Sequence, residues 1–380
     1  MKKRLLFIST IFPSAVANKH ATYSVQLLSA LTEYYDIDII NPISWLQRLA
    51  DNIANVEILD GMEIYHPTYW YTPGLLRHRY GSFYFASVKN RAYRLIKGRS
   101  YDVILASWLY PDGWAAAKIA KKWGIPLYIM ALGTDANRLI PQSKVARQTV
   151  DAITQAEKTI CMSHAMKGKL IAVGAEADKL IVMYNGVQRS IFHTIGKDNA
   201  RKELGLSVIG SLILFVGNLL KTKGLDELSD AFAILCKNDR FKDARLLIAG
   251  AGKYEDKFKK RIASNGLTDR TVFMGSCSLN VVAKLMNATD VVCLPSYSEG
   301  LPNVVLEALC CNAKVVATDV GGIPELQNIH KNLYLVPPKD ARKLADTLVT
   351  ALNAVCYEDK ADDIYSWKAQ AEKIAALMMK

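Results

Sequence analysis

The stretch Ser296-Tyr297-Ser298-Glu299-Gly300-Leu301-Pro302-Asn303-Val304-Val305-Leu306-Glu307-Ala308 places two glutamates on the two sides of an expected loop-to-helix junction. The apolar run 290–295 before it is typical of a buried parallel strand. Pro302 suits the first turn of a helix, because a missing N–H costs nothing there. We therefore expect Glu299 in a loop and Glu307 inside the helix that follows.

The amides of Leu301, Asn303 and Val304 would point at whatever lies in front of that helix. Together with the helix dipole they favour an anion such as a pyrophosphate. Taken alone, Glu299 could be a first-turn acid and Glu307 a solvated helix residue. Their combination, in a loop at the carboxyl end of a parallel strand where open α/β sheets bind ligands, favours a sugar-nucleotide site.

This segment resembles the signature of the retaining nucleotide-sugar glycosyltransferases of family 4, and the resemblance spans nearly the whole chain. It implies an α/β chain of the GT-B fold, with two Rossmann-like, doubly wound parallel-sheet domains that face a central cleft. It also implies that Glu299 contacts the donor sugar and that Glu307 holds the nucleotide ribose. The neighbouring backbone would approach the diphosphate at Gly300, Leu301, Pro302 and Asn303.

Short apolar runs alternate with amphipathic stretches such as 25–34 and 114–123, a pattern that predicts two parallel sheets. The expected strands are 4–9, 37–40, 103–107, 127–131 and 159–162, then 212–216, 245–249, 271–274, 291–294 and 315–317. An Asn-Gly turn interrupts the pattern at 184–188, which resembles the family's interdomain element. We expect an acceptor-binding domain at 1–187, a nucleotide-sugar-binding domain at 188–363, and a last helix at 364–380 that the resemblance packs on the first domain.

The segment Gly217-Asn218-Leu219-Leu220-Lys221-Thr222-Lys223-Gly224 follows an expected strand. A lysine there can neutralise a departing pyrophosphate, and Lys223 is assigned that role. The family usually has Gly-Arg-Leu, three residues and Lys-Gly, so Asn218 stands at the arginine position. Asparagine cannot make the bidentate, charged contact of a guanidinium. This predicts a weaker donor site, a donor site in which Lys221 compensates for the missing arginine, or a poor catalyst. Lys221 could also be a plain solvated residue.

Three further loops follow expected strands. Ser276 and Cys277 follow the strand at 271–274, and the resemblance makes them contacts for the nucleotide base. The loops 107–113 and 131–138 face the acceptor side, where the candidates are Tyr110, Asp112, Gly133 and Asp135. Gly133-Thr134-Asp135 resembles a family motif near the reaction centre, so Asp135 joins Glu299 and Lys223 as a catalytic candidate; capping of the next helix is the alternative.

Two loops depart from the family pattern. Relatives often carry a histidine where Leu132 stands, and a glycine where His20-Ala21-Thr22-Tyr23 stands. No metal or cofactor is expected besides a UDP- or GDP-linked sugar as substrate. The pair Asp36-Ile37-Asp38 fits a strand entrance better than a magnesium site. Seven cysteines, an odd number, give no disulfide framework and suit a reducing cytoplasm.

The net charge of +12 is concentrated in the first half of the chain. Between Glu63 and Asp102 there is no acidic residue, while seven basic residues alternate with aromatic and leucine residues over 70–99. This pattern favours an anionic membrane surface. A solvated basic helix with its aromatics in the core is the alternative, and nucleic acid is not expected because no recognition motif accompanies the charge.

The resemblance and the charge together predict a retaining, metal-independent hexosyltransferase on the cytoplasmic face of the membrane. Its acceptor would be a polyprenyl-diphosphate-linked glycan in surface-polysaccharide assembly. A non-catalytic membrane- or glycan-binding descendant and a sugar-nucleotide epimerase or hydrolase are the alternatives. Residues 4–11 are expected to form the first strand, although 1–17 also imitate a signal peptide.

Overall fold

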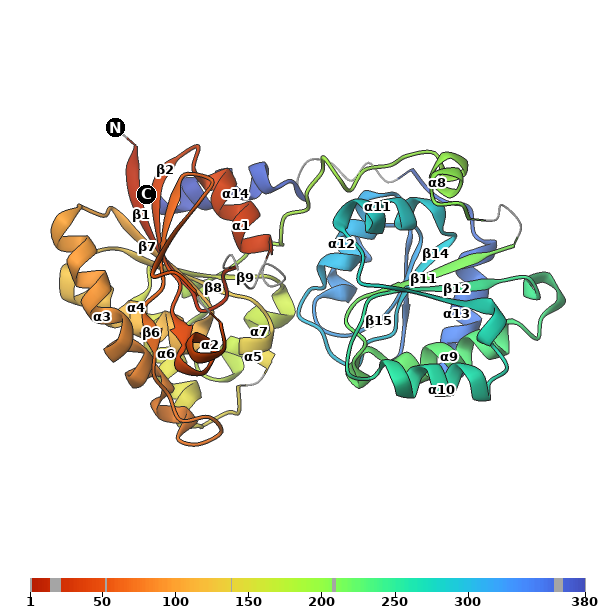
Figure 1. Ribbon diagram of the computed structural model, residues 1–380, viewed down its shortest axis with the longest axis horizontal. Helices are drawn as coiled ribbons and strands as arrows, with labels where there is room; N and C mark the ends of the chain where they lie inside the picture. Colours follow the sequence, from red (N-terminus) through yellow and green to blue (C-terminus); the bar gives the residue numbers. More distant parts are fainter. Residues whose placement is uncertain are drawn as a thin grey trace. The chain divides into compact units, whose positions relative to one another are not determined.

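The computed structural model describes residues 2–13, 22–51, 53–137, 139–206, 210–358 and 365–379. The predictions for His20 and Ala21 lie outside these ranges. The chain divides into two compact units, one formed by Met1–Gly186 with Trp367–Lys380 and the other by Val187–Ser366. Each unit is an α/β layer structure with helices packed on a twisted sheet (Figure 1).

The first unit has an eight-stranded sheet in the order β10-β9-β8-β7-β1-β2-β5-β4. All neighbouring strands are parallel except β4 and β5. The strands are β1 (Lys3–Ile8), β2 (Tyr35–Ile40), β4 (Val56–Leu59), β5 (Met62–Tyr65), β7 (Val103–Ser107), β8 (Leu127–Ala131), β9 (Lys158–Cys161) and β10 (Leu180–Val182). A separate two-stranded sheet joins β3 (Ile43–Ser44) to β6 (Thr68–Tyr69).

The antiparallel edge was absent from the sequence prediction, although the sequence contains its signal. Asp60 and Gly61 connect β4 to β5 with φ angles of 50° and 79°. Two consecutive positive φ values are what a tight hairpin turn needs, and Asp-Gly is a preferred pair for it. The alternating exposure of β4 marks it as the edge of the sheet.

The second unit has a six-stranded, fully parallel sheet in the order β13-β12-β11-β14-β15-β16. Its strands are β11 (Leu212–Val216), β12 (Arg245–Ala249), β13 (Thr271–Gly275), β14 (Val291–Leu294), β15 (Val315–Thr318) and β16 (Leu333–Val336). Strands β11, β12, β14 and β15 are nearly continuous buried runs, as expected for a sheet covered on both faces.

Helices cover both faces of the two sheets. In the first unit α3, α4 and α6 pack side by side, while α14 packs on α1 (Figure 1). In the second unit α9 packs with α10 and α13, and α11 packs with α8 and α12. The helices are α1 (Thr22–Leu31), α2 (Trp45–Ala50), α3 (Tyr80–Gly98), α4 (Trp114–Trp123), α5 (Thr134–Asn137), α6 (Lys144–Gln155), α7 (His164–Ala172), α8 (Lys197–Glu203), α9 (Leu225–Leu235), α10 (Glu255–Ser264), α11 (Leu279–Ala288), α12 (Asn303–Cys310), α13 (Ala341–Asn353) and α14 (Trp367–Met378). Within the described ranges, none is long and apolar enough to cross a bilayer.

Strand order creates one topological switch point in each sheet. In the first unit the chain runs outward from β1 to β2 and then, on the other side, from β7 to β10. In the second unit it runs from β11 to β13 on one side and from β14 to β16 on the other. Loops that leave the carboxyl ends of the two central strands diverge at such a point and leave a crevice for ligands. Ligand sites are therefore expected beside the carboxyl ends of β1 and β7 and of β11 and β14.

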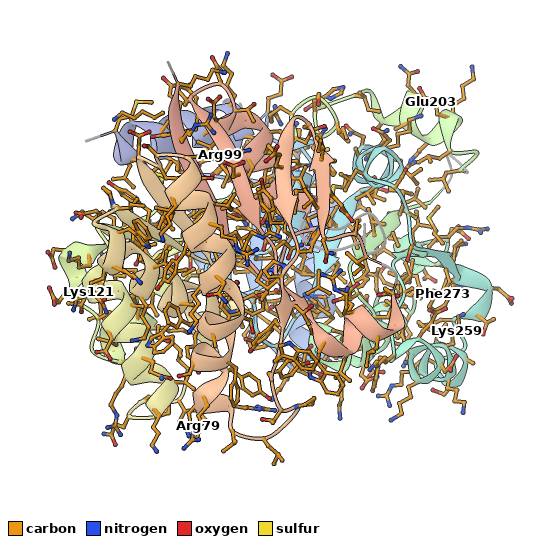
Figure 2. All side chains as sticks on the ribbon, turned by 60° about the vertical axis from the view of Figure 1, so that its left-hand side comes forward. Arg79, Arg99, Lys121, Glu203, Lys259 and Phe273 are labelled. Carbon is orange, nitrogen blue, oxygen red and sulfur yellow. The ribbon has the colours of Figure 1, made fainter. Side chains whose placement is uncertain are left out.

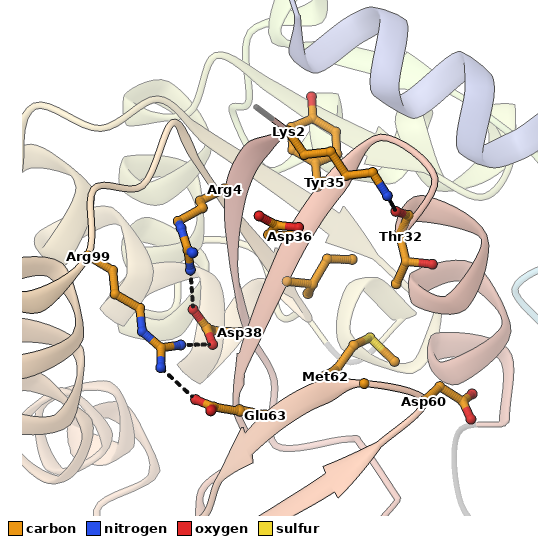
Figure 3. Close-up of a pocket in the computed structure, with 12 residues that line it drawn as sticks. Lys2, Arg4, Thr32, Tyr35, Asp36, Asp38, Asp60, Met62, Glu63 and Arg99 are labelled. Atoms are coloured by element: carbon orange, nitrogen blue, oxygen red, sulfur yellow. Dashed lines mark hydrogen bonds and ion pairs between the residues drawn. The ribbon is translucent and has the colours of Figure 1, made fainter.

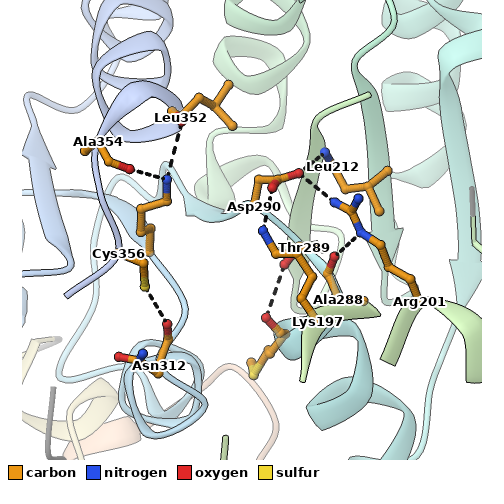
Figure 4. Close-up of polar contacts among 12 residues, drawn as sticks. Lys197, Arg201, Leu212, Ala288, Thr289, Asp290, Asn312, Leu352, Ala354 and Cys356 are labelled. Atoms are coloured by element: carbon orange, nitrogen blue, oxygen red, sulfur yellow. Dashed lines mark hydrogen bonds and ion pairs between the residues drawn. The ribbon is translucent and has the colours of Figure 1, made fainter. Parts of the chain in front are cut away.

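The opposite, amino-terminal edge of the second sheet is closed by ion pairs. Asp290 precedes β14 and accepts hydrogen bonds from Lys197, Arg201 and the amide of Leu212, at 2.6, 2.8 and 2.7 Å (Figure 4). These contacts tie α8 to the start of β11. The predicted donor-site residues lie at the opposite, carboxyl edge of the same sheet.

Helix α14 contributes to the core of the first unit. Trp367, Ala371, Ile374 and Ala375 belong to its buried cluster, although nearly 180 residues separate them from the rest of that unit in sequence. The indole of Trp367 lies against Gly186, where a Cβ atom would collide with the ring. Gly186 has a negative φ, so the packing of Trp367, rather than a turn, requires glycine at this position.

We expect Gly186→Ala to destabilise the first unit by about 1–3 kcal/mol, because the added methyl group displaces the Trp367 ring. Urea unfolding of the full chain measures this. Gly98→Ala is the matched control, since Gly98 has no atom within 4 Å of a Cβ position. If both variants unfold at the same urea concentration, Gly186 does not support the packing of α14.

Candidate functional site

An ion pair joins the two loops at the switch point of the second unit. Lys223 belongs to the short helix η4 (Lys221–Lys223) after β11, and Glu299 lies in the loop after β14. The Lys223 Nζ atom donates to Glu299 Oε1 at 2.6 Å. The two side chains are 22% and 11% exposed, so the pair is partly shielded from water. The structure thus brings together two residues that are 76 positions apart in sequence.

Further hydrogen bonds fix these two loops to each other. The amide of Tyr297 donates to the carbonyl of Thr222 at 2.9 Å, and the Tyr297 hydroxyl donates to the carboxylate of Glu227 at 2.7 Å. Gly321 has a φ of 61° and approaches the carbonyls of Glu299 and Gly300 so closely that any side chain would collide with them. The position of Glu299 is therefore set by three neighbouring loops.

Tyr297 was not among the predicted site residues. It lies two positions before Glu299 in the stretch that decided the prediction, and its role became visible only with the partner Glu227 in α9. Tyr254 makes an equivalent contact, because its hydroxyl donates to Asp226 at 2.7 Å. The first turn of α9 is thus held by two tyrosines from different loops.

Glu307 lies in the middle of α12 and is half-buried among apolar neighbours. Burial raises the pKa of its carboxyl group to about 7. A neutral-to-ionised transition near neutral pH makes this group an acceptor whose strength depends on pH. Such a perturbed carboxyl next to a switch point is typical of a ligand site.

The start of α12 differs slightly from the prediction. The helix begins at Asn303, and Pro302 is its N-cap residue with an extended ψ of 126°, not a member of the first turn. Pro302 has no polar side chain with which to cap the amides that follow. Gly300, Pro302 and Asn303 are partly exposed, while Leu301 is buried.

The remaining donor candidates lie on other loops of the same edge. Asn218 and Lys221 are both exposed, one on each side of the buried Leu219. Ser276 and Cys277 follow β13, the edge strand of the sheet, and Ser276 is the more exposed of the two. Their contact with a nucleotide base stays a prediction.

In the first unit, Asp112 spans the switch point. It is fully buried, and its carboxylate accepts hydrogen bonds from the amide and the hydroxyl of Thr10, after β1, and from the Tyr84 hydroxyl in α3 at 2.9 Å. Burial raises the pKa of Asp112 to about 7. The side chain is therefore used to hold two loops together, and the predicted acceptor contact would have to come from its neighbours.

Asp135 is placed in a similar way. Its carboxylate accepts from the amides of Leu109, Leu132, Gly133 and Ala136, at distances between 2.8 and 3.3 Å. Burial raises its pKa, although each amide opposes the shift. Asp135 thus binds the loop after β7 to the loop after β8, which is more than the local helix cap considered from the sequence. Its predicted catalytic role stays a prediction.

Tyr110 and Gly133 are the other two residues predicted on the acceptor side, and Gly133 is one of the amide donors to Asp135. Tyr110 contacts a different element. Its hydroxyl accepts from the amide of Gly81 at 2.7 Å and donates to the carbonyl of Arg77 at 3.1 Å. Both hydrogen-bonding functions of this hydroxyl are therefore occupied by the α3 region. Tyr110 positions the start of α3 relative to the loop after β7.

Two family models match the chain. The model for glycosyl transferases group 1 matches residues 196–377, and the model for glycosyltransferase family 4 matches residues 21–190. The chain belongs to glycosyltransferase family 4. Each model falls almost wholly on one of the two units.

Individual relatives agree with this assignment. The proposed teichuronic acid biosynthesis glycosyltransferase TuaC of Bacillus subtilis (strain 168) is 29% identical over 95% of this chain and 92% of its own length. Sucrose-phosphate synthase from Thermosynechococcus elongatus has a TM-score of 0.81 at 18% identity, covering 99% of this chain and 98% of that one. HepE from Anabaena, solved in complex with UDP, has a TM-score of 0.71 at 19% identity, covering 99% and 95%. The two structures show that this family 4 glycosyltransferase has the GT-B fold.

The Asp36-Ile37-Asp38 pair lies within β2 of this glycosyltransferase, where Asp36 is the second residue of the strand and Asp38 the fourth. Asp38 is buried and accepts from Arg99 at 2.6 Å and from the Tyr101 hydroxyl, while Arg99 also contacts Glu63 at 3.0 Å (Figure 3). The carboxylate of Asp38 therefore already has two protein donors, and it lies inside the strand, whereas the sequence predicted a strand entrance for both aspartates.

We expect Asp112→Asn to destabilise this glycosyltransferase by about 1–3 kcal/mol, because an amide cannot accept from all three donors at once. The effect depends on pH with a defined sign. The carboxyl group has a higher pKa in the native state than in the unfolded chain, so its stabilising contribution is full below about pH 4 and falls as the pH rises to about 7. The deficit of the variant should therefore be larger at pH 5 than at pH 7.

Urea unfolding at both pH values measures this difference. Asp151→Asn, an exposed carboxylate on α6, is the control and should match the wild type. A deficit for Asp112→Asn that is constant with pH, or larger at pH 7, would contradict the raised pKa.

Proposed function

We propose that this glycosyltransferase moves a hexosyl group from a UDP- or GDP-linked sugar to a glycan acceptor, with retention of configuration and without a metal ion. The observation that carries the proposal is the ion pair between Lys223 and Glu299 across the switch point of the second unit. The GT-B fold and the family assignment support it, and so does HepE, a structural neighbour that was solved with UDP.

The ion pair supplies both groups that the donor requires. A departing nucleoside diphosphate gains negative charge, and a fixed ammonium group at the strand end stabilises that charge. When a diphosphate approaches, it competes with Glu299 for Lys223. The carboxylate of Glu299 is then released to accept hydrogen bonds from sugar hydroxyls, so one binding event prepares both contacts.

Glu307 is proposed to hold the ribose through its hydroxyl groups, as the family resemblance implies. A carboxylate accepts two hydroxyl donors better than a neutral carboxyl group does. Because the pKa of Glu307 is about 7 in the free protein, nucleotide binding should strengthen as the pH rises through 7. The amides at the start of α12 would face the diphosphate.

Retention follows from attack on the same face that the leaving group departs from. The bond between the anomeric carbon and the diphosphate oxygen breaks, and the acceptor oxygen bonds to that carbon on the same face. The acceptor proton passes to a diphosphate oxygen, which leaves as the nucleoside diphosphate. This sequence requires no dedicated base and agrees with Asp112 and Asp135 being engaged by protein donors.

A non-catalytic descendant of a transferase is the second candidate. Asn218 stands where the family usually has an arginine, and it is exposed with no charge to offer a phosphate. If that loss disables the site, the protein would bind glycans or membranes without turnover. Nucleotide binding separates the two candidates.

Thermal unfolding with UDP, GDP and their sugars tests the proposed donor site. A ligand at one hundred times its dissociation constant stabilises a protein by about 2.7 kcal/mol. We expect one of the two bases to stabilise the wild type and Lys221→Ala but not Lys223→Ala. Stabilisation by no nucleotide would favour the non-catalytic candidate, and equal stabilisation of Lys223→Ala would remove Lys223 from the site.

We further propose a polyprenyl-diphosphate-linked acceptor and a position on the inner face of the membrane. The relation to TuaC supports surface-polysaccharide assembly. Within the segment 70–99, for which membrane binding was predicted, the aromatic residues differ in exposure. Tyr84 is buried, and Tyr71, Phe83 and Phe85 pack against the core, so these aromatics do not face outward.

The exposed apolar residues gather instead in the loop between β6 and α3. Trp70, Leu75 and Leu76 are 62%, 69% and 46% exposed, and the exposed Arg77 and Arg79 follow them directly. Figure 2 shows Arg79 at one end of α3 and Arg99 at the other. Apolar side chains beside arginines fit the interface of an anionic bilayer.

Charge reversal at Arg77 and Arg79 should release the protein from vesicles that contain phosphatidylglycerol. Each basic residue near anionic lipid contributes about 1 kcal/mol, so the double variant should bind about tenfold more weakly or worse. Flotation with these vesicles measures binding, with phosphatidylcholine vesicles for comparison. Arg342→Glu, an exposed residue of the second unit, is the control. Unchanged flotation of the double variant would remove this loop as the membrane contact.

A further inference from the structure

Trp108 has a backbone conformation that tryptophan rarely adopts. Its φ and ψ angles are 88° and 136°. Residues other than glycine adopt such angles only with backbone strain. The residue follows the last residue of β7, one of the two strands at the switch point of the first unit. The strain is therefore located where an open α/β sheet binds its ligand.

Hydrogen bonds on both sides hold Trp108 in this conformation. Its amide donates to the carbonyl of Met130 at 2.9 Å, and its carbonyl accepts from the amide of Gly113 at 2.9 Å. The next amide, of Leu109, donates to the buried carboxylate of Asp135 at 3.0 Å. These three contacts come from different parts of the chain and together hold the backbone of Trp108, and with it the direction of its Cα–Cβ bond.

The strain is not offset by packing of the indole in the core. Trp108 is half-buried, yet in the described part of the chain it is not among the residues packed against the core of the first unit, whereas Trp114 and Trp123 are. Within the described residues, the indole N–H of Trp108 donates no hydrogen bond either. A large aromatic side chain on a fixed backbone thus lies partly exposed at the switch point.

We propose that Trp108 is the acceptor-binding platform: its indole stacks on the apolar C–H face of the terminal sugar ring of the acceptor. A pyranose ring presents several C–H groups on one face, and an aromatic ring binds such a surface with little loss of side-chain freedom. The inference rests on the proposed function, because the bound sugar is the acceptor of that transfer. It makes Asp135 and Gly113 positioning residues for Trp108.

Saturation-transfer NMR with octyl glycosides of glucose, galactose and N-acetylglucosamine, kept below their micelle concentrations, tests the platform without turnover. Wild type and Trp108→Phe should saturate the ring protons of at least one glycoside. Trp108→Gly should weaken that binding by about tenfold, as expected for the loss of one stacking contact. Trp123→Ala, which removes a core-packed tryptophan, should bind the glycoside as the wild type does.

Thermal stability is a second readout. If Trp108 had only a structural role, its replacement would lower the unfolding temperature, whereas the platform predicts no decrease. Glycine adopts the observed φ without strain, so Trp108→Gly should unfold at the wild-type temperature or above it, whereas Trp123→Ala should unfold at a lower temperature. Lower stability of Trp108→Gly with unchanged glycoside binding would overturn the platform.

The two proposals fail separately. If a nucleotide stabilises the wild type but no glycoside depends on Trp108, the platform is wrong and the donor site stands. If glycoside binding depends on Trp108 but no nucleotide binds, the transferase proposal is wrong and the sugar platform stands.

Discussion

The structure of the candidate site depends on one constraint, the divergence of loops at the switch point of each parallel sheet. In the second unit, β11 and β14 lie side by side although their starts, Leu212 and Val291, are 79 positions apart, and their loops bring Lys223 to Glu299. The ion pair exists only because the chain reverses its winding direction there. The tyrosine contacts to α9 and the close approach of Gly321 preserve the geometry in which this pair forms.

The first unit uses its switch point differently. The two buried carboxylates at this switch point, Asp112 and Asp135, accept hydrogen bonds from backbone amides and hydroxyls of neighbouring loops. Such buried carboxylates are expensive unless fully hydrogen-bonded, and here each bridges loops from different strands. Beside them, Trp108 is a half-buried aromatic residue at that edge, with its backbone held by hydrogen bonds. Under the two proposals, one unit presents charge to a diphosphate, and the other presents an aromatic face to a sugar.

Most of the parallel strands and the positions of Glu299 and Glu307 could be predicted from the sequence. Uninterrupted apolar runs marked the buried parallel strands, and the spacing around Pro302 placed Glu299 in a loop and Glu307 in a helix. Local patterns could not show the partners of Asp112, Tyr297 or Trp108, because each partner comes from a distant segment that only the sheet order brings near. The β4–β5 hairpin was missed although its Asp-Gly turn was readable. For the aromatic residues of 70–99 the sequence left two alternatives, a membrane surface or packing in the core, and helical periodicity turns Tyr84 into the core.

The most direct test is calorimetric titration of the plain nucleoside diphosphate and of its sugar into wild type, Lys223→Ala and Glu299→Gln. If a diphosphate replaces Glu299 as the partner of Lys223, Glu299→Gln should bind the plain nucleoside diphosphate at least as tightly as the wild type and lose affinity for the nucleotide sugar. Lys223→Ala should lose both. Equal weakening of plain nucleoside diphosphate binding in the two variants would contradict the exchange of partners at the switch point.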